Sequence, residues 1–418
     1  MSSPASKTAP SVLAIHRYYW PDAPPYASML RAIVEHWRLA GHDTEILSTQ
    51  PSYKPLANIP RRPKRELLDG TPVRRIALPR ERRKLVKALN MALFTLAVFI
   101  HVVRRRRDVV MCSTSPPVAL GAATSIAARL RRSAFIYHCM DLHPEIGALS
   151  GEFRNRFVYS LLLRIDRATC RRAAAVVVLS EDMRDSLLKR DPSIADRIVV
   201  LNNFDLPDYD EQSPSPATSE VADDQRLRLV FTGNVGRFQG LEAIIDGLIA
   251  IKDDVDAELV FMGEGTAKAG LQRRAEALPA DSRVAIRFRQ HGTPTEAREL
   301  MRTADLGLVT LTPEIIRFAY PSKTMTYLSE GLPLLVATET DSQLARTVEE
   351  ERLGFVVPPL DAASVAETIR MAADRRSDLS AMRATARTYA DAHFSQDQAL
   401  TRWERLLSQV SDNEVLHV

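Results

Sequence analysis

The stretch Ala319-Tyr-Pro-Ser-Lys-Thr-Met-Thr-Tyr-Leu-Ser-Glu-Gly-Leu-Pro-Leu-Leu-Val-Ala337 decides the architecture expected for the second half of the chain. Pro321 suits the first turn of a helix, and Gly331 ends that helix before the apolar run that closes the stretch. Ser322 and Lys323 place a hydroxyl and an ammonium at the helix N-terminus, where unpaired backbone N–H groups suit a phosphate. An ordinary capped helix with a surface lysine would have the same residues. Other parts of the chain must therefore distinguish a phosphate site from such a helix.

The bulk composition indicates a folded protein of two domains. The chain has 418 residues, of which 45% are hydrophobic and 26% are charged. A formal net charge of +4 is too small to indicate nucleic-acid binding. The three cysteines, Cys112, Cys139 and Cys170, lack the spacing of a metal site and fit a reducing compartment. We therefore expect neither a metal site nor a nucleic-acid partner.

Positive charge is concentrated in the first half of the chain. Between Arg61 and Arg107 there are fifteen Lys or Arg residues and three acids. The region brackets an apolar segment, residues 88–103, which at 16 residues falls short of the roughly 20 that span a bilayer. We expect a buried or interfacial helix there. The polar residues 1–10 do not have the pattern of a signal peptide.

Apolar runs of strand length alternate with helix-like segments in the first half. Residues 11–16 form such a run, a Pro-rich loop follows, residues 27–39 show helical spacing, and residues 44–47 begin a second run. This order predicts a β-α-β unit. Further strands are predicted at residues 73–78, 109–112, 134–137, 174–179 and 198–201, which favours a mostly parallel sheet covered on both faces.

The alternation restarts after a polar, Pro-rich and acidic linker at residues 205–225. Strands are predicted at residues 227–231, 258–262, 284–288, 306–310, 334–337 and 354–357, and residues 396–410 read as a terminal helix. We therefore expect an α/β protein with two doubly wound, Rossmann-like domains, residues 1–205 and 206–395, facing a cleft. Residues 396–418 would form a helix at the domain boundary.

Glycine turns follow two strands of the predicted second domain. Gly233, Gly236 and Gly240 follow the first strand, and Gly263 with Gly265 follows the next. Glycines let backbone N–H groups close around an anion, although tight packing alone explains such turns too. The spacing is not that of a P-loop. Because these turns and Ser322-Lys323 follow strands of one parallel sheet, we expect them at one edge, where an anion could bind.

The segment Tyr137-His-Cys-Met-Asp-Leu-His-Pro-Glu145 follows a strand of the first domain and concentrates titratable side chains. Two histidines and two carboxylates can serve acid–base or hydrogen-bonding chemistry, although His138 could equally be a buried structural histidine. Pro144 favours a rigid loop here.

Five motifs in order resemble a known family. They are Gly41-His42 before a strand, the 141–145 segment, the 233–242 turn, the 263–265 turn, and Pro321-Ser-Lys323 followed by Tyr327-Leu-x-x-Gly331-x-Pro333. Together they resemble the family-four, retaining glycosyltransferases of the GT-B fold. Within that family the chain looks most like enzymes of bacterial surface-polysaccharide synthesis, including transferases for N-acetylfucosamine-type sugars.

The resemblance implies a nucleotide diphosphate sugar, a UDP-sugar in our expectation, bound mainly by the C-terminal domain, and transfer with retention that requires no metal or other cofactor. The acceptor would be a lipid-linked or growing glycan, bound mainly by the N-terminal domain. The residues implied in catalysis are Lys323, Arg237, His138 and Asp141. Those implied in donor binding are Gly233, Asn234, Gln239, Gly263, Ser322 and Thr326, and those implied on the acceptor side are Asp22, Tyr26 and Glu145.

The chain departs from the family pattern at two places. Family members commonly carry two glutamates, and Phe318 and Thr326 stand at those positions here, whereas Glu330 should point elsewhere. A hydroxyl can still meet a ribose hydroxyl, but it is a weaker acceptor than a carboxylate. The second departure is Pro24-Pro25-Tyr26, where members often have a glycine pair.

The same sequence features are compatible with other functions. An epimerase or hydrolase acting on sugar nucleotides could use the same architecture, and a non-catalytic partner could keep the donor site without turnover. The apolar segment with its basic flanks could lie in an anionic membrane interface, or it could be an ordinary domain helix. We expect a cytoplasmic protein that contacts the inner face of the plasma membrane peripherally.

Overall fold

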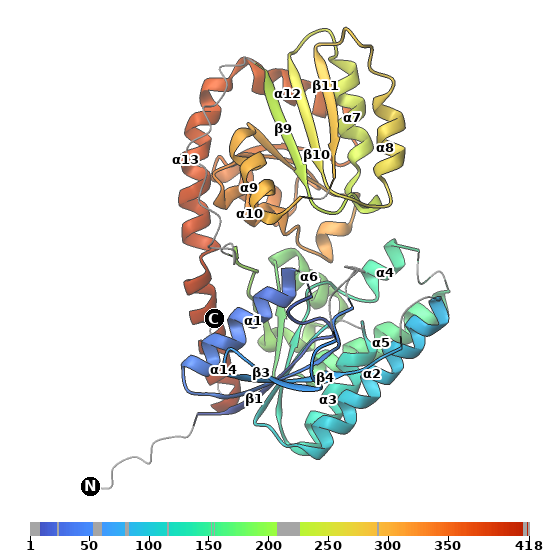
Figure 1. Ribbon diagram of the computed structural model, residues 1–418, viewed down its shortest axis with the longest axis vertical. Coiled ribbons are helices and arrows are strands. Elements are labelled where there is room, and N and C mark those ends of the chain that lie inside the picture. Colours follow the sequence, from blue (N-terminus) through green and yellow to red (C-terminus); the bar gives the residue numbers. More distant parts are fainter. Residues whose placement is uncertain are drawn as a thin grey trace, which may run out of the picture. The chain divides into compact units, whose positions relative to one another are not determined.

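The computed structural model describes residues 9–22, 25–52, 61–79, 83–114, 117–151, 153, 155–206, 226–290, 292–412 and 416. Most of the linker predicted at 205–225, and Pro24 of the first loop, lie outside these ranges. The chain divides into two compact units, residues 1–202 with 396–418, and residues 203–395 (Figure 1). Each unit is an α/β structure built on one sheet, so the expected fold class is confirmed.

The sheet of the first unit has the strand order β3-β4-β2-β1-β5-β6-β7-β8. Its strands are parallel except for β3, which pairs antiparallel with β4. β3 is missing from the sequence prediction. The strands are β1 (Ser11–Ile15), β2 (Asp43–Thr49), β3 (Arg65–Leu68), β4 (Thr71–Ile76), β5 (Val109–Ser113), β6 (Ala134–His138), β7 (Ala175–Val178) and β8 (Ile198–Val200).

Helices of the first unit connect and cover these strands. Helices α2, α3 and α5 pack side by side, α2 on α3 and α3 on α5 (Figure 1). The helices are α1 (Pro25–Leu39), α2 (Lys84–Arg104), α3 (Ala119–Arg131), α4 (Glu145–Leu149), α5 (Arg156–Arg172), α6 (Glu181–Arg190), a 3-10 turn at Pro192–Arg197, and α14 (Gln396–Asp412).

The apolar helix α2 is longer than its sequence suggests. It has 21 residues and begins at Lys84, within the basic run that we took for a flank. Among the described residues it is the one helix, over Leu85–Arg104, that is long and apolar enough to cross a membrane. The expectation that this segment is too short to span a bilayer is therefore wrong.

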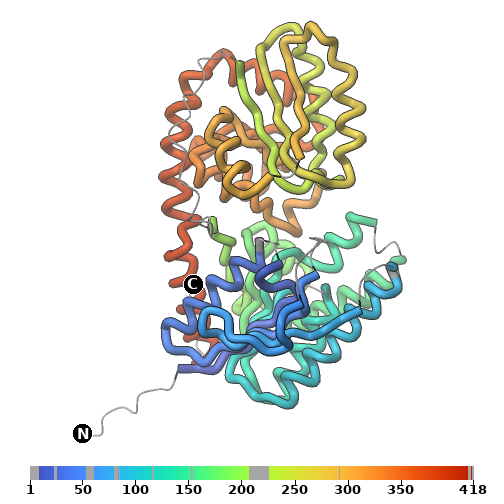
Figure 2. Tube along the Cα trace, viewed as in Figure 1, coloured from blue at the N-terminus to red at the C-terminus, as the bar shows by residue number. Residues whose placement is uncertain are grey.

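The C-terminal helix α14 returns to the first unit, as the red end of the trace beside the blue beginning shows (Figure 2). Trp403 of α14 is buried, and its ring centre lies 6.1 Å from that of Trp37 in α1. His42 Nε2 also contacts Glu404 Oε1 at 2.7 Å. These contacts make α14 an integral part of the first unit.

The sheet of the second unit is entirely parallel, with the order β11-β10-β9-β12-β13-β14. Buried aliphatic and aromatic residues form separate cores that include the strand residues Leu229 and Val230. Because successive residues of a strand point to opposite faces, both faces of this sheet are covered. The strands are β9 (Leu227–Thr232), β10 (Ala257–Met262), β11 (Val284–Arg289), β12 (Leu306–Thr310), β13 (Leu334–Ala337) and β14 (Gly354–Val357).

Seven α-helices and two short 3-10 turns connect the described strands of the second unit. They are a 3-10 turn at Arg237–Gln239, α7 (Leu241–Ala250), α8 (Lys268–Ala275), α9 (Pro294–Thr303), a 3-10 turn at Ile315–Arg317, α10 (Lys323–Ser329), α11 (Gln343–Glu350), α12 (Ala362–Asp374) and α13 (Arg376–His393). The stretch with which the sequence analysis began forms a loop, the short helix α10, a turn at Gly331 and strand β13. This order is the predicted one.

Candidate functional site

The two predicted glycine turns pack backbone against backbone at the carboxyl edge of the second sheet. The Gly233 N–H donates to the carbonyl of Met262 at 2.9 Å, and the Val235 N–H donates to the carbonyl of Glu264 at 3.0 Å. A Cβ atom at Gly263 would lie 1.8 Å from the Gly233 carbonyl oxygen, and one at Gly265 would lie 2.1 Å from that of Val235. Both positions therefore require glycine.

Helix α10 brings Lys323 to the same turns. Gly233 has a φ of +100°, and a Cβ atom there would lie 3.8 Å from Lys323 Nζ. The helix is tied to the end of β9 by the Tyr327 hydroxyl, which accepts a hydrogen bond of 2.9 Å from the Thr232 N–H. Lys323 and the glycine turns thus lie together, as the parallel sheet predicted.

The ammonium of Lys323 has no acidic partner within the described residues. Its Nζ lies 4.5 Å from the centre of the Phe231 ring, a cation–π distance. Burial of the side chain lowers the pKa of Lys323 to about 8. A cation placed here without a counter-charge is suited to receive an anionic ligand.

The other predicted donor-side residues differ in their surroundings. Asn234 and Arg237 are exposed at the Gly233 turn, and Ser322 is exposed just before α10. The side-chain oxygen of Gln239 accepts a 3.0 Å hydrogen bond from the Gly236 N–H, so it closes its own turn. Thr326 is partly buried on α10. Their roles toward a donor stay predictions.

Glu330 points away from the glycine turns, as expected. Its carboxylate is buried and forms ion pairs with Arg298 and Arg302 of α9. Arg298 also contacts Asp205 Oδ2 at 3.1 Å and donates to the carbonyl of Leu206 at 2.7 Å. Glu330 is therefore part of a structural network.

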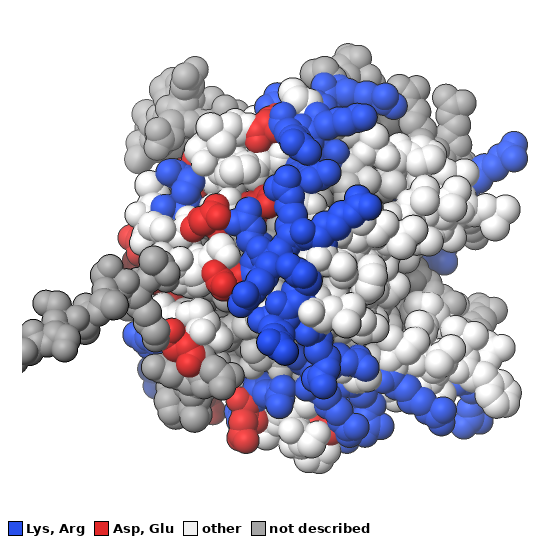
Figure 3. Space-filling model, turned by 90° about the horizontal axis from the view of Figure 1, so that it is seen from below, with Lys and Arg blue, Asp and Glu red and all other residues white. Residues whose placement is uncertain are grey.

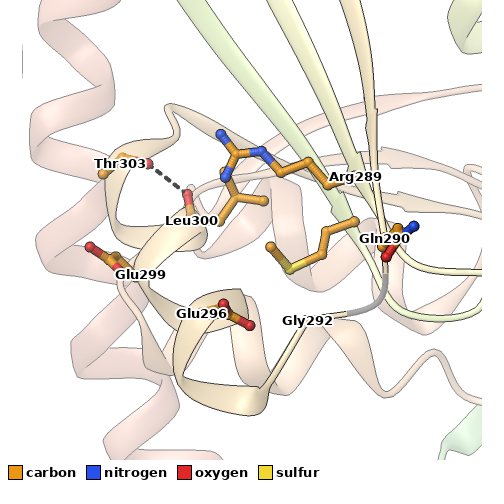
Figure 4. A pocket seen from close by; sticks show the side chains of 8 residues that line it. Arg289, Gln290, Gly292, Glu296, Glu299, Leu300 and Thr303 are labelled. Carbon is orange, nitrogen blue, oxygen red and sulfur yellow. Dashed lines mark hydrogen bonds between the residues drawn. The ribbon is translucent and has the colours of Figure 1, made fainter.

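A cavity of about 620 Å³ lies in the second unit, and Figure 4 shows the side chains that line it. Its walls come from the ends of β10 and β11 and from α9. They include Met262, directly before Gly263, and the side chains of Arg289, Gln290 and Glu296. Lys268 joins this cavity to the turns, since its Nζ donates to the carbonyls of Gly263 at 3.0 Å and Arg289 at 3.2 Å. Lys268 therefore links the Gly263 turn to the end of β11, where the cavity begins.

The predicted residues of the first unit are largely buried. His138 is 1% exposed, and its Nδ1 contacts the Tyr26 hydroxyl at 2.9 Å. Its ring packs against Trp403, with ring centres 4.9 Å apart. Burial lowers the pKa of His138 to about 3, so the imidazole is neutral near pH 7. The structure gives His138 and Tyr26 a packing role, and direct parts in catalysis or acceptor binding stay predictions.

Asp141 and Glu145 have different electrostatic surroundings on the same segment. Burial raises the pKa of Asp141 to about 6. Glu145 is paired with Arg190, whose Nη1 lies 3.1 Å from Glu145 Oε1, and Arg190 also pairs with Asp166. Asp22, from the first loop, accepts a 2.9 Å hydrogen bond from the Ser52 N–H. Asp22 and Glu145 thus make internal contacts, and their roles toward an acceptor stay predictions.

Several residues that shape these sites were not assigned a role from the sequence. Phe231 and Lys268 lie in or beside the glycine-turn segments, so the strand-end positions could have indicated them. Tyr327 was noted as part of a motif but without a role, and its hydroxyl fixes α10 to β9. Arg190 is far in sequence from Glu145 and Asp166, and no local pattern marks it as their partner.

Two families of known proteins match the two parts of the chain. The Glycosyl transferase 4-like domain matches residues 26–203, and Glycosyl transferases group 1 matches residues 226–374. The first match ends one residue beyond the boundary between the two structural units, and the second lies within the second unit.

Named relatives agree with these matches. The probable glycosyltransferase WbjE of Pseudomonas aeruginosa is 25% identical over 308 residues, covering 72% of this chain and 74% of that protein. The putative colanic acid biosynthesis glycosyl transferase WcaI of Escherichia coli is 20% identical over 350 residues, covering 79% of this chain and 84% of that protein.

Solved structures of low sequence identity share the fold. HepE of Anabaena, crystallised with UDP, with UDP-glucose, and with UDP and glucose, has a TM-score of 0.68 at 16% identity, covering 96% of this chain and all of that one. Sucrose-phosphate synthase of Thermosynechococcus elongatus has a TM-score of 0.70 at 15% identity, covering 97% of this chain and all of that one. With an N-terminal glycosyl transferase 4-like domain and a C-terminal group 1 domain, the chain is a glycosyltransferase of the GT-B fold.

Proposed function

We propose that this glycosyltransferase transfers a sugar from a nucleotide diphosphate sugar, a UDP-sugar, to a hydroxyl of a lipid-linked or growing glycan, with retention of the anomeric configuration. The observation that carries the proposal is Lys323, a partly buried cation without an acidic partner among the described residues, beside the packed glycine turns. The diphosphate of the donor supplies the negative charge that this position lacks.

The reaction exchanges one bond at the anomeric carbon of the sugar. The bond from that carbon to the diphosphate oxygen breaks, and a bond to the acceptor oxygen forms on the same face of the sugar. The nucleoside diphosphate leaves with the bonding electron pair, and an oxygen of this leaving diphosphate takes the proton of the acceptor hydroxyl. Lys323 and Arg237 stabilise the negative charge that develops on the leaving diphosphate. We propose that these cations remove the need for a metal ion or other cofactor.

The second unit binds the donor in this proposal. Gly233, Asn234 and Gly263 contribute the turns around the diphosphate, with Gln239 holding the first turn in shape. The cavity lined by Met262 and Gln290 is large enough for the nucleoside. The UDP complexes of HepE, which shares the fold, support a uridine nucleotide.

The residue proposed to bind the ribose is Thr326, whose hydroxyl is a weak hydrogen-bond acceptor. We propose that Thr326, with Ser322, contacts the donor at α10, where the hydroxyl of Thr326 replaces the stronger carboxylate acceptor that other family members provide. This replacement favours a second candidate function, a partner that binds the nucleotide sugar with little turnover of its own.

The first unit binds the acceptor in this proposal, with Asp141 near the reacting sugar and His138 supporting it. The relative WcaI, which is named for colanic acid biosynthesis, supports a role in polysaccharide synthesis. We propose an N-acetylfucosamine-type sugar as donor group, and a cytoplasmic site of action at the inner face of the plasma membrane.

The test is incubation of the purified protein with labelled UDP-, GDP- and dTDP-sugars, with and without membrane lipid extract. Transfer of label into a lipid-extractable product, only with extract and with a UDP-sugar, is the expected result. Release of free sugar or an epimer without extract would instead identify a hydrolase or epimerase. Tight donor binding without turnover under any condition would favour the non-catalytic partner.

A further inference from the structure

Helix α2 exposes a continuous apolar stripe. Leu85, Leu89, Leu93, Leu96 and Ile100 recur at intervals of three and four residues, which places them on one side of the helix. Leu85 is 82% exposed and Leu96 is 55% exposed. Such a row of leucines is unusual on a surface that faces only water.

The neighbouring helices extend this apolar surface. Helix α3, which packs on α2, exposes Ile126 and Leu130, and α5, which packs on α3, exposes Phe157 and Leu161. Phe157 is 87% exposed. Poor packing of α2 alone would not explain why apolar side chains are exposed on α3 and α5 as well.

These three helices also lack exposed acids. Asp166 of α5 is the one acidic residue in α2, α3 and α5. It is buried, accepts a 2.9 Å hydrogen bond from the Tyr137 hydroxyl and pairs with Arg190. The surface therefore offers apolar area and positive charge with no negative charge of its own.

The positive charge gathers where the three helices end. Because crossover helices in a parallel sheet run opposite to the strands, α2, α3 and α5 end at the same edge. Basic residues occupy their last turns and the positions that follow, namely Arg104, Arg105, Arg106, Arg107, Arg129, Arg131, Arg132, Arg171 and Arg172. Figure 3 shows Lys and Arg side chains forming a band across one face, beside a broad uncharged region.

Some of this charge is not balanced within the protein. Arg107 pairs with Asp43 and Glu45, and Arg171 pairs with Asp191. By contrast, no ion pair is formed by Arg104, Arg129 or Arg132 with any side chain that the structure describes. These arginines are available to an external anion.

A small cavity combines the two properties. It has a volume of about 290 Å³ and lies along the C-terminal half of α2. Leu47 and Ile100 give it apolar walls, while Arg74, Arg104 and Arg105 give it positive charge. A phosphate group joined to short hydrocarbon segments matches this lining, as in the headgroup region of a phospholipid.

We propose that α2, α3 and α5 together form a surface that docks in the plane of an anionic membrane, with the leucines in the interface and the arginines on lipid phosphates. This inference deepens the proposed function and rests on it for its purpose, since docking would bring the enzyme to a lipid-linked acceptor. We propose an anionic membrane as the partner because anionic lipid complements a surface that is both apolar and basic.

Two other arrangements fit the contacts less well. If α2 crossed the membrane, it would lose the packing of Phe94, Val98 and Val102, which are fully buried, and the pairing of His101 with Glu45 at 3.5 Å. If a second copy of the chain covered this surface, two bands of arginine would have no opposite charge to meet. In-plane docking keeps the fold intact and satisfies the charge.

The experiment is flotation of the full-length protein with phosphatidylglycerol–phosphatidylcholine vesicles, and with vesicles of phosphatidylcholine alone. We expect binding to the anionic vesicles, with little binding to neutral ones and a strong decrease at high salt. Leu89→Gln with Leu96→Gln, and Phe157→Ser alone, test α2 and α5 separately. Phe157→Ser should lower the vesicle partition coefficient several-fold, and the two leucine substitutions together should lower it about tenfold.

Charge is tested by Arg129→Glu with Arg132→Glu, which should lower partitioning into anionic vesicles by at least about tenfold. Met371→Gln and Arg273→Glu, at exposed positions of the second unit, are the matched controls and should bind like the parent. Equal binding to both vesicle types, or variants that bind like the parent, would overturn the proposal. The proposal would also be overturned if light scattering showed a dimer for the parent and a monomer for the Leu89 and Leu96 double variant, because this result would identify a protein interface.

The two proposals can fail separately. Transfer to a detergent-solubilised acceptor should be unchanged in the surface variants, because their positions lie outside the donor site. Vesicle binding without transfer of any sugar would contradict the proposed function only, and transfer without vesicle binding would contradict the docking surface only.

Discussion

The Nζ atom of Lys323 lies 4.5 Å from the centre of the Phe231 ring, at the point where strand β9 passes into the Gly233 turn. The aromatic face and the glycine backbone leave the ammonium without a counter-ion from any described side chain, and burial lowers its pKa to about 8. This pair of residues connects α10 to the glycine turns and is the basis of the donor site proposed here.

Replacing Lys323 should separate charge from packing. Lys323→Ala should lower kcat/KM for the donor by about 10² or more, the scale of losing one partner of a charge that develops in the transition state. Lys323→Arg keeps the charge but changes its shape, and it should retain more activity than the alanine variant. Steady-state kinetics at fixed acceptor concentration measures both, and an unchanged rate in Lys323→Ala would contradict the placement of the diphosphate.

The pH dependence of donor binding follows from the lowered pKa of Lys323. The diphosphate favours the ammonium form, so donor affinity should be constant well below pH 8 and fall as pH rises through about 8. The donor affinity should fall by up to about tenfold per pH unit. This fall should be absent in Lys323→Arg, because the arginine side chain has a pKa of about 12 or more and stays charged over this pH range. Calorimetric titration between neutral and alkaline pH provides the measurement, and a flat profile for the parent would count against the assignment.

The glycine contact between the two turns should be essential for stability. Gly263→Ala places a Cβ atom 1.8 Å from the Gly233 carbonyl oxygen at a φ of +157°, so it should destabilise the protein by at least about 2 kcal/mol. Gly270→Ala is the matched control, since a Cβ atom there meets nothing within 4 Å and the residue lies in helix α8. It should stabilise by roughly 0.5–1 kcal/mol. Denaturant unfolding compares the two, and equal effects would show that the turns can adjust.

A carboxylate at position 326 should strengthen donor binding. Thr326→Glu supplies the charged acceptor for a ribose hydroxyl, which should raise donor affinity by about fivefold. Thr326→Gln is the neutral comparison and should give a smaller gain. If Thr326→Glu binds the donor no better than the parent, the ribose does not lie beside this part of α10.

Glu330 should matter for folding and not for the donor. Removing its carboxylate leaves the partly buried Arg298 with Asp205 as its remaining acidic partner, so Glu330→Ala should cost about 1–3 kcal/mol of unfolding free energy. The exposed Glu349→Ala should change it by less than about 0.5 kcal/mol. Donor affinity of the folded Glu330→Ala protein should equal that of the parent, and a clear loss would place Glu330 in the donor site.

The sequence predicted which segments meet at the carboxyl edge of the second sheet, but it did not predict the side-chain contacts there. Gly233, Gly263 and Lys323 follow strands of one parallel sheet, so their proximity follows from strand order alone. Gln239 looked equally available for a ligand, but its side chain closes the Gly236 turn. A periodic pattern does not reveal which donor a side-chain oxygen will meet.

Other differences have equally local causes. Strand β3, Arg65–Leu68, has only four residues, two charged followed by two leucines, next to a turn, so it lacks the alternating pattern that predicts a strand. The start of α2 was misplaced because Lys84 and Lys87 belong to a basic run, yet both continue the helix. The pairing of Arg190 with Asp166 joins residues 24 positions apart, and only the fold brings them together.

The most direct test of the donor site compares UDP with uridine. Titration of each into the parent and into Lys323→Ala isolates the contribution of the diphosphate, because uridine has the nucleoside without the phosphates. We expect the parent to bind UDP far more tightly than uridine, and Lys323→Ala to lose most of this difference while its affinity for uridine is unchanged. An equal preference for UDP in the two proteins would contradict the proposed donor site.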